Sequence, residues 1–256
     1  MVTIAFAVIY AFAFLFGICI GSFLNVLIYR VPLGINVAKG RSFCPQCHNT
    51  LTARDLVPLV SFGLLGGHCR FCGAKISWRY PLVEALGGML GLLSVAFWFV
   101  SWQALLVFAV TCVLLTISFI DWDTQEIPDV LNIVLMGLAI TAIFVFRDVS
   151  LLSRVIGFFE IPVLMIVVNL IKKGSFGGGD IKMCAAAGFL LGWQNMLVAA
   201  FIGIITGGIY GVYLLASRKK SRKEHFAFGP FLAVGITVSL YMGSLIWQAY
   251  LGLFSI

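Results

Sequence analysis

Long apolar stretches, separated by short polar connections, run through the whole chain. A helix needs about 20 apolar residues to cross the hydrocarbon core of a bilayer. Eight stretches approach that length: residues 3–29, 81–100, 102–120, 130–146, 150–171, 181–193, 195–217 and 227–254. The sixth is the shortest, and only a tight turn separates it from the seventh. The pattern predicts an all-α polytopic membrane protein with about eight transmembrane helices.

Composition supports the same class. Hydrophobic residues make up 61% of the chain and charged residues 11%, with a mean hydropathy of +1.08, whereas soluble domains carry about 25% charged residues. The first stretch has no basic segment ahead of it and no small-residue cleavage site, and it is longer than the apolar part of a secretory signal. We therefore expect this stretch to be retained as a helix.

Basic residues collect in three of the polar connections. Of the 17 Lys and Arg residues, seven lie between the first two stretches, three lie within 172–182 and five lie within 218–223. If eight helices alternate, these connections share one side, and the positive-inside rule makes that side cytoplasmic and places both termini outside. Topology and contact with anionic membrane lipid then account for the net charge of +7. Nucleic-acid binding is not predicted.

Two acids stand at the ends of apolar stretches. Asp121 closes the third stretch, and Asp180 opens the sixth directly after three glycines. Acids embedded in a membrane are rare and mark functional sites by default. If the fold brings these two together they can share one proton, because two nearby negative charges raise one of the two pKa values. One carboxylate would then activate water and the other would protonate a peptide carbonyl, which predicts aspartyl protease chemistry at the cytoplasmic face.

Each acid also has a purely structural interpretation. Asp180 alone fits a helix N-cap, and Asp121 alone fits a solvated helix end. The preceding glycines, Gly177, Gly178 and Gly179, are expected to allow close backbone approach and positive φ angles.

Three further acids follow Asp121. Residues two apart on a helix point about 200° away from each other, so Asp121 and Asp123 cannot address one water unless the helix has already ended. Asp129 follows Pro128 and is expected in the first turn of the next helix, in a structural or supporting role. Asp123 and Glu126 are interpreted as solvated loop acids.

Four cysteines form two Cys-x-x-Cys pairs between the first and second apolar stretches. The pairs are separated by 21 residues, which is typical of four-thiolate zinc sites. A disulfide or a redox pair is the alternative, but thiols stay reduced in the cytoplasm and two matched turns favour metal. The sequence predicts one structural zinc in a small cytoplasmic zinc-ribbon-like module, with the ligands Cys44, Cys47, Cys69 and Cys72.

Several other polar residues lie within or beside apolar stretches. Asn25 and Arg30 have two interpretations, methyl-donor or substrate binding and hydrogen bonding between helices. Glu84 falls in the first turn of the second stretch, where an acid stabilises the helix dipole, and its nearness to the cysteines also suits a role in methyl transfer. Arg154 and Glu160 are expected to pair with each other or with solvent.

These motifs together resemble the bacterial type IV prepilin peptidases, a Gly-x-Gly-Asp aspartyl protease family. The resemblance runs in order from about residue 17 to residue 235. The segments that carry it are residues 21–26, 29–32, 44–47, 69–72, 76–84, 120–129, 177–182 and 228–231.

The resemblance implies an enzyme of the bacterial cytoplasmic membrane that removes the basic leader of prepilins and pseudopilins. It also implies N-methylation of the new N-terminal residue with S-adenosylmethionine, and the complete set of four cysteines favours this bifunctional type. The catalytic pair of the family corresponds to Asp121 and Asp180, and its tetracysteine motif to the four cysteines named above. Residues predicted to support these sites are Gly177, Gly178, Gly179, Lys182, Asp129 and Glu84.

The expected organisation is a first helix (1–30), a tetracysteine module associated with methylation (31–80) and a membrane peptidase domain (81–256). A peptidase with a purely structural zinc module, a transporter and a non-catalytic scaffold are the alternatives. The chain has no glycine-rich nucleotide fingerprint between a strand and a helix, so the sequence does not assign the residues that bind the methyl donor. It does not identify the substrate pilins or the oligomeric state either.

Overall fold

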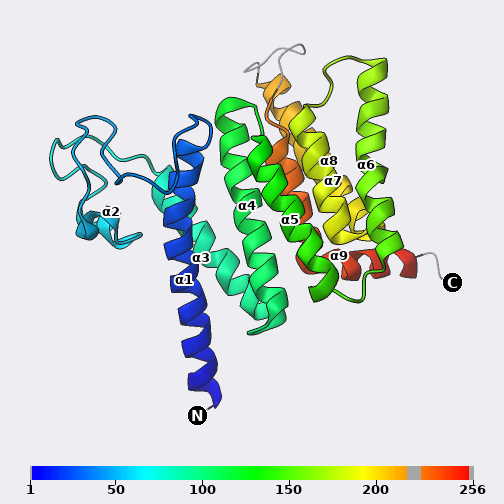
Figure 1. The fold of residues 1–256 in the computed structure, drawn as a ribbon, viewed down its shortest axis with the longest axis horizontal. Coiled ribbons are helices and arrows are strands. Elements are labelled where there is room, and N and C mark those ends of the chain that lie inside the picture. The colour runs from blue at the N-terminus through cyan, green and yellow to red at the C-terminus, as the bar shows by residue number, and fades with distance from the viewer. Residues whose placement is uncertain (1, 218–225, 254–256) are drawn as a thin grey trace. The chain divides into compact units, whose positions relative to one another are not determined.

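The computed structural model describes residues 2–217 and 226–253 (Figure 1). Within these residues the chain is helical, without named strands, which confirms the predicted all-α class. The long helices are α1 (Val2–Arg30), α3 (Arg79–Trp98), α4 (Trp102–Thr124), α5 (Asp129–Val145), α6 (Leu151–Ile171), α7 (Gly178–Leu191), α8 (Trp193–Ala216) and α9 (Gly229–Gly252). Between α1 and α3 lie a short 3-10 turn, η1 (Ala53–Leu56), and a five-residue helix, α2 (Val60–Leu64).

Each of the eight predicted stretches corresponds to one long helix. Among the described residues, α1, α3, α4, α6, α8 and α9 are long and apolar enough to cross a membrane. The helices α5 and α7 have only 17 and 14 residues, and at about 1.5 Å of rise per residue they are shorter than the roughly 30 Å of a bilayer core. Asp180 lies in the first turn of the short helix α7, whereas Asp121 lies in the last turn of the long helix α4.

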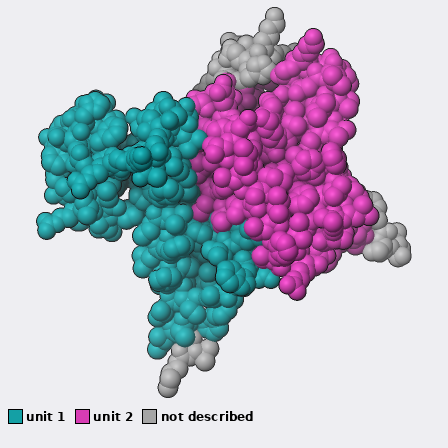
Figure 2. Space-filling model, in the orientation of Figure 1, with its two compact units in different colours: residues 1–108 teal, residues 109–256 magenta. Residues whose placement is uncertain are grey.

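The chain divides into two compact units, residues 1–108 and 109–256, with the boundary inside α4 (Figure 2). In the first unit α1 packs closely on α3. A side chain at Gly21 would lie within 2.8 Å of the backbone of Glu84, so the missing side chain permits this approach. The Asn25 amide donates a 3.1 Å hydrogen bond to the carbonyl of Tyr80. Of the two interpretations of Asn25, this contact agrees with hydrogen bonding between helices.

Arg30 closes the loop that follows α1. Its side chain is 7% exposed, and its guanidinium donates to the backbone carbonyls of Asn36, Lys39 and Arg41 at 2.7–3.2 Å. Because these carbonyls occupy the guanidinium, the structure assigns Arg30 to loop closure rather than to ligand binding.

In the second unit Arg154 joins three helices. It is 1% exposed and donates to carbonyls at the ends of α5 and α7, those of residues 142, 146, 189 and 190, at 2.7–3.1 Å. The expected pairing of Arg154 with Glu160 or with solvent is therefore wrong. The last carbonyls of a helix lack intrahelical donors and carry partial negative charge. The C-terminal ends of two helices therefore stabilise the buried guanidinium of Arg154 more than one carboxylate or solvent alone would.

Candidate functional site

Asp121 lies in the last turn of α4 and is 5% exposed. The backbone N–H of Gly229, the first residue of α9, donates a 2.9 Å hydrogen bond to its Oδ2. A Cβ atom at residue 229 would lie only 2.8 Å from the same oxygen. Glycine at this position therefore lets the N-terminus of α9 reach the carboxylate, where the free N–H groups of a helix start favour negative charge.

Asp180 is the third residue of α7, and Gly177 is the N-cap. Its Oδ2 lies beside Gly177, 3.2 Å from the position that a Cβ would take there, and the carboxylate experiences the negative charge of Asp121. Its other carboxylate oxygen, Oδ1, is buried without a hydrogen-bond partner among the described residues. The fold thus brings both predicted acids into one site. A capping role accounts for one oxygen of Asp180 and leaves the other unexplained.

The start of α7 is held by contacts from two other segments. Asn132, in the second turn of α5 and 5% exposed, donates from Nδ2 to the carbonyl of Gly179 at 3.3 Å. The rings of Phe176 and Phe228, which precede α7 and α9, lie 5.8 Å apart between centroids. Asn132 and Gly229 were not predicted as site residues. The only sequence signals were an amide in an apolar stretch and a glycine in a segment shared with the family.

The three glycines before Asp180 do not behave alike. None has a positive φ angle, and Gly177 has φ −69°, so the expectation of positive φ is wrong. Only Gly179 makes a close backbone approach: a Cβ there would lie 2.7 Å from Cβ of Ile127, whereas one at Gly178 would meet nothing within 4 Å. The backbone is already helical at residues 178 and 179, which is why no left-handed conformation is needed.

The remaining predicted residues of this site lie around its exposed edge. Lys182 Nζ and Asp129 Oδ1 form an exposed ion pair at 2.7 Å between the first turns of α7 and α5. Helix α4 continues to Thr124, so Asp123 points away from the site, and both Asp123 and Glu126 are exposed. These two acids remain outside the pair formed by Asp121 and Asp180.

The four cysteines form one cluster in the first unit. Their Sγ atoms all lie within 4.8 Å of one another, and the Cys44 and Cys72 sulfurs are 3.9 Å apart. Zn–S bonds of about 2.3 Å in a tetrahedron require S···S distances of about 3.8 Å, whereas a disulfide requires about 2.05 Å. All four thiols are free. The donor set and its spacing therefore fit one zinc ion.

The two cysteine turns are near copies of each other. Cys44 N–H donates to Asn49 O and His48 N–H to Cys44 O; in the second turn Cys69 N–H donates to Ala74 O and Gly73 N–H to Cys69 O. His48 and Gly73 occupy equivalent positions, with φ angles of 56° and 70°. This repeated turn directs two sulfurs from each side toward a common centre.

An ion pair fastens the second cysteine turn to η1. Arg70 Nε lies 2.7 Å from Oδ1 of Asp55, whose side chain is 3% exposed. Hydrogen bonds from the hydroxyl and N–H of Thr52, together with Arg70, hold the pKa of the Asp55 carboxyl below its usual range. This ion pair thus stabilises the tetracysteine module in addition to any bound metal.

The fold and these two sites define a polytopic helical membrane protein with a paired-aspartate site and a four-thiolate centre. The model of the Bacterial Peptidase A24 N-terminal domain matches residues 15–99, and that of the Type IV leader peptidase family matches residues 108–212. The chain belongs to the type IV leader peptidase family. The first match includes the four cysteines and Glu84, and the second includes both aspartates.

Several relatives carry the name prepilin leader peptidase/N-methyltransferase. The relative from Aeromonas salmonicida is 32% identical over 94% of this chain and 94% of its own length. That from Legionella pneumophila is 33% identical over 93% of each chain. That from Pseudomonas aeruginosa is 33% identical over 93% of this chain and 91% of its own. No solved structure matches the chain.

Proposed function

We propose that the protein cleaves the leader peptides of type IV prepilins or pseudopilins with Asp121 and Asp180, and then methylates the new N-terminus. The observation that carries this proposal is the shared site: Asp121 is held by Gly229, and Asp180 keeps a buried oxygen that has no hydrogen-bond partner within residues 2–217 and 226–253. Membership of the leader peptidase family and the names of the relatives support the same reaction.

The chemistry follows from two carboxyl groups that hold one proton between them. The ionised group takes a proton from water as the water oxygen bonds to the scissile carbonyl carbon, and the protonated group donates its proton to the carbonyl oxygen. Collapse of the resulting diol breaks the C–N bond, with a proton passing to the leaving nitrogen. The Gly229 N–H binds Oδ2 of Asp121. The other oxygen, Oδ1, is therefore the one that accepts or donates the proton in these steps.

The thiolate cluster supports zinc as a structural ion. Four thiolates with no open coordination position hold zinc for folding rather than for catalysis. We assign the module of residues 31–80 to methylation, with S-adenosylmethionine as methyl donor, and residues 81–256 to cleavage. In the peptidase-only alternative the same cluster would serve only to fold the module.

The distribution of basic residues supports a position in the bacterial cytoplasmic membrane with the aspartates at the cytoplasmic face and both termini outside. Of the basic groups that carry this assignment, residues 218–223 lie outside the described part of the chain. A transporter would concentrate polar groups near mid-membrane in two related halves, whereas Asp121 and Asp180 lie at helix ends.

Incubation of the purified protein with a prepilin and methyl-labelled S-adenosylmethionine tests the proposal. We expect a shortened pilin that carries the label on its new N-terminal residue. Cleavage without label would leave the peptidase-only alternative, and an uncut prepilin would favour a transporter or scaffold.

A further inference from the structure

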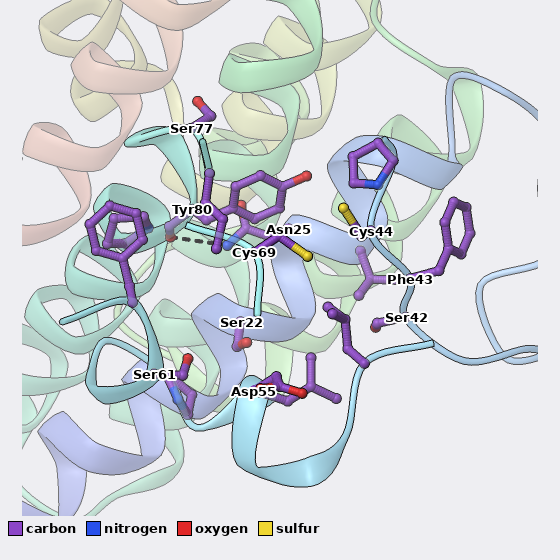
Figure 3. A pocket seen from close by; sticks show the side chains of 18 of the residues that line it. Ser22, Asn25, Ser42, Phe43, Cys44, Asp55, Ser61, Cys69, Ser77 and Tyr80 are labelled. Atoms are coloured by element: carbon purple, nitrogen blue, oxygen red, sulfur yellow. Dashed lines mark hydrogen bonds between the residues drawn. The ribbon is translucent and has the colours of Figure 1, made fainter. Parts of the chain in front are cut away.

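A cavity of about 650 Å³ lies in the first unit, between α1, the tetracysteine module of residues 31–80 and the start of α3 (Figure 3). Ser22 and Asn25 of α1, Cys44 and Cys69 of the cysteine turns, and Tyr80 of α3 surround it. Sites for small organic molecules occupy about 300–1,000 Å³. The cavity therefore has the volume of a ligand site.

Three of the polar groups in its wall are held by hydrogen bonds or ion pairs within the protein. Arg30 donates to three backbone carbonyls, Asp55 forms its ion pair with Arg70, and Asn25 donates to the carbonyl of Tyr80. These groups shape the cavity and hold its walls together.

Glu84 is different. Its side chain lines the cavity and is 9% exposed. Within the described part of the chain its one hydrogen bond comes from the backbone N–H of Leu59, which donates to Oε2 at 2.8 Å, and no Lys or Arg pairs with it. A buried carboxylate is costly unless a cation balances it. Glu84 is thus a negative group suited to a positively charged ligand.

The backbone of Leu59, whose N–H donates to Glu84, has a strained conformation. Leu59 has φ 61° and ψ −45°, and the N–H of Val60 donates to the carbonyl of Pro58 at 2.6 Å. This is the rare γ-turn of positive φ, which ordinary residues adopt at a cost. Strained backbone persists mainly at functional sites, and here it directs an N–H at the carboxylate in the cavity wall.

Aromatic rings complete this environment. Phe62 and Tyr80 line the cavity, and the Phe62 ring is held by Trp78, with 4.9 Å between ring centroids. Aromatic faces attract organic cations. The basic side chain of Lys75 also lines the cavity, so its wall carries both signs of charge. A carboxylate, a basic group and two aromatic side chains in one cavity suit an organic ligand that bears a cationic centre and an anionic group.

We propose that this cavity binds S-adenosylmethionine and that the carboxylate of Glu84 balances its sulfonium charge, an assignment that rests on the methylation step proposed above. In that step the amine nitrogen of the cleaved pilin bonds to the methyl carbon, the S–CH₃ bond breaks with its electron pair going to sulfur, and the amine loses a proton to water. The product is a neutral thioether. Loss of the charge opposite Glu84 would then promote release of the spent donor.

The test is equilibrium binding of labelled S-adenosylmethionine and of its neutral product, S-adenosylhomocysteine, to the purified full chain. Glu84→Gln keeps an oxygen for the Leu59 N–H and removes only the charge. We expect its Kd for S-adenosylmethionine to rise about tenfold or more, the usual effect of losing a charged partner, with little change for the neutral product. Glu160→Gln, a matched change in the other unit, should leave both affinities at their wild-type values.

Unchanged affinity for S-adenosylmethionine in Glu84→Gln would overturn the assignment, and so would an equal loss for both ligands, which would indicate collapse of the cavity rather than loss of a charge contact. Ser22→Phe provides a second variant, since it fills the cavity from α1. It should abolish binding, whereas Leu15→Phe, at an exposed position of the same helix, should not.

Zinc content and leader cleavage, measured on the same samples, report whether each variant is folded. A wild-type protein that cleaves leaders but does not bind S-adenosylmethionine would refute the methylation step itself. Binding by wild type that survives both Glu84→Gln and Ser22→Phe would refute only the location of the site.

Discussion

The backbone N–H of Gly229 donates a hydrogen bond to Oδ2 of Asp121 across 108 positions of sequence. It places the first turn of α9 directly on one of the two acids of the candidate active site. The residues of the site therefore come from the end of α4 and the starts of α5, α7 and α9. Substitutions at these helix ends test the role of each.

Asparagine at either acid should abolish leader cleavage. Asp121→Asn and Asp180→Asn each remove one carboxylate from a pair that acts as a unit, so the double variant should be no worse than either single one. Cleavage of a purified prepilin is the measurement. Asp123→Asn, two residues away on the exposed side of α4, should retain most activity. An active Asp121→Asn enzyme would show that the pair is not catalytic.

Gly229→Ala should reduce cleavage while the protein still folds and inserts. The added Cβ would lie 2.8 Å from Oδ2 of Asp121, and a catalytic group displaced by about 1 Å loses on the order of 100-fold in rate. Gly208→Ala is the control, because a Cβ there meets nothing within 4 Å. Equal cleavage by the two variants would mean that the contact of Gly229 with Asp121 is not needed for the reaction.

The glycines before Asp180 should respond differently to alanine. Gly179→Ala forces its Cβ against Ile127 at 2.7 Å, whereas Gly178→Ala adds a methyl group in open space. We expect Gly179→Ala to lose most cleavage activity. Gly178→Ala should be close to wild type and slightly more stable, because alanine is favoured over glycine in a helix by up to about 1 kcal/mol. Parallel assays of cleavage and thermal stability compare them, and a reversed order would refute the packing argument.

The purified protein should contain about one zinc per chain, as a closed four-thiolate site requires. Replacing Cys44 and Cys47 with Ser should release it and should impair methylation more than cleavage, since both aspartates belong to the other unit. Metal analysis of the wild type and the double variant checks the first part. Wild-type protein without metal and with a disulfide among the four cysteines would indicate a redox or cross-linking role.

The repeated cysteine turns provide a test of the module's stability. Gly73→Ala should destabilise it by about 1–2 kcal/mol, because a side chain at φ 70° meets the left-handed penalty. His48→Gly removes that penalty at the equivalent position, where φ is 56°, and should retain zinc at least as well as wild type. Zinc release during chelator titration measures both. Faster release from His48→Gly than from Gly73→Ala would show that the histidine side chain itself contributes to the site.

Local patterns in the sequence are enough to predict the helices and the cysteine cluster of this protein. Hydrophobic stretches predict the positions of the eight helices α1 and α3 to α9, because the requirement to bury apolar residues in lipid acts on each stretch separately. Among the described residues, six of these helices are long enough to cross a bilayer. The Cys-x-x-Cys spacing predicts a common centre, since each turn orients its own two sulfurs. The choice of Asp121 and Asp180 depended on the family resemblance as well, because an isolated acid at a helix end is also typical of a cap.

Only the tertiary structure decided which distant groups complete the sites. Nothing near Asp121 in the chain indicates that Gly229 would hold it, or that Asn132 would bind the carbonyl of Gly179, since these contacts depend on how whole helices pack. The same holds for Arg154, which binds the carbonyls at two helix ends rather than Glu160, and for Glu84, which faces Leu59 across 25 positions. Helix formation follows from neighbouring residues, whereas the partner of a buried polar group is set by packing between segments that the chain order does not specify.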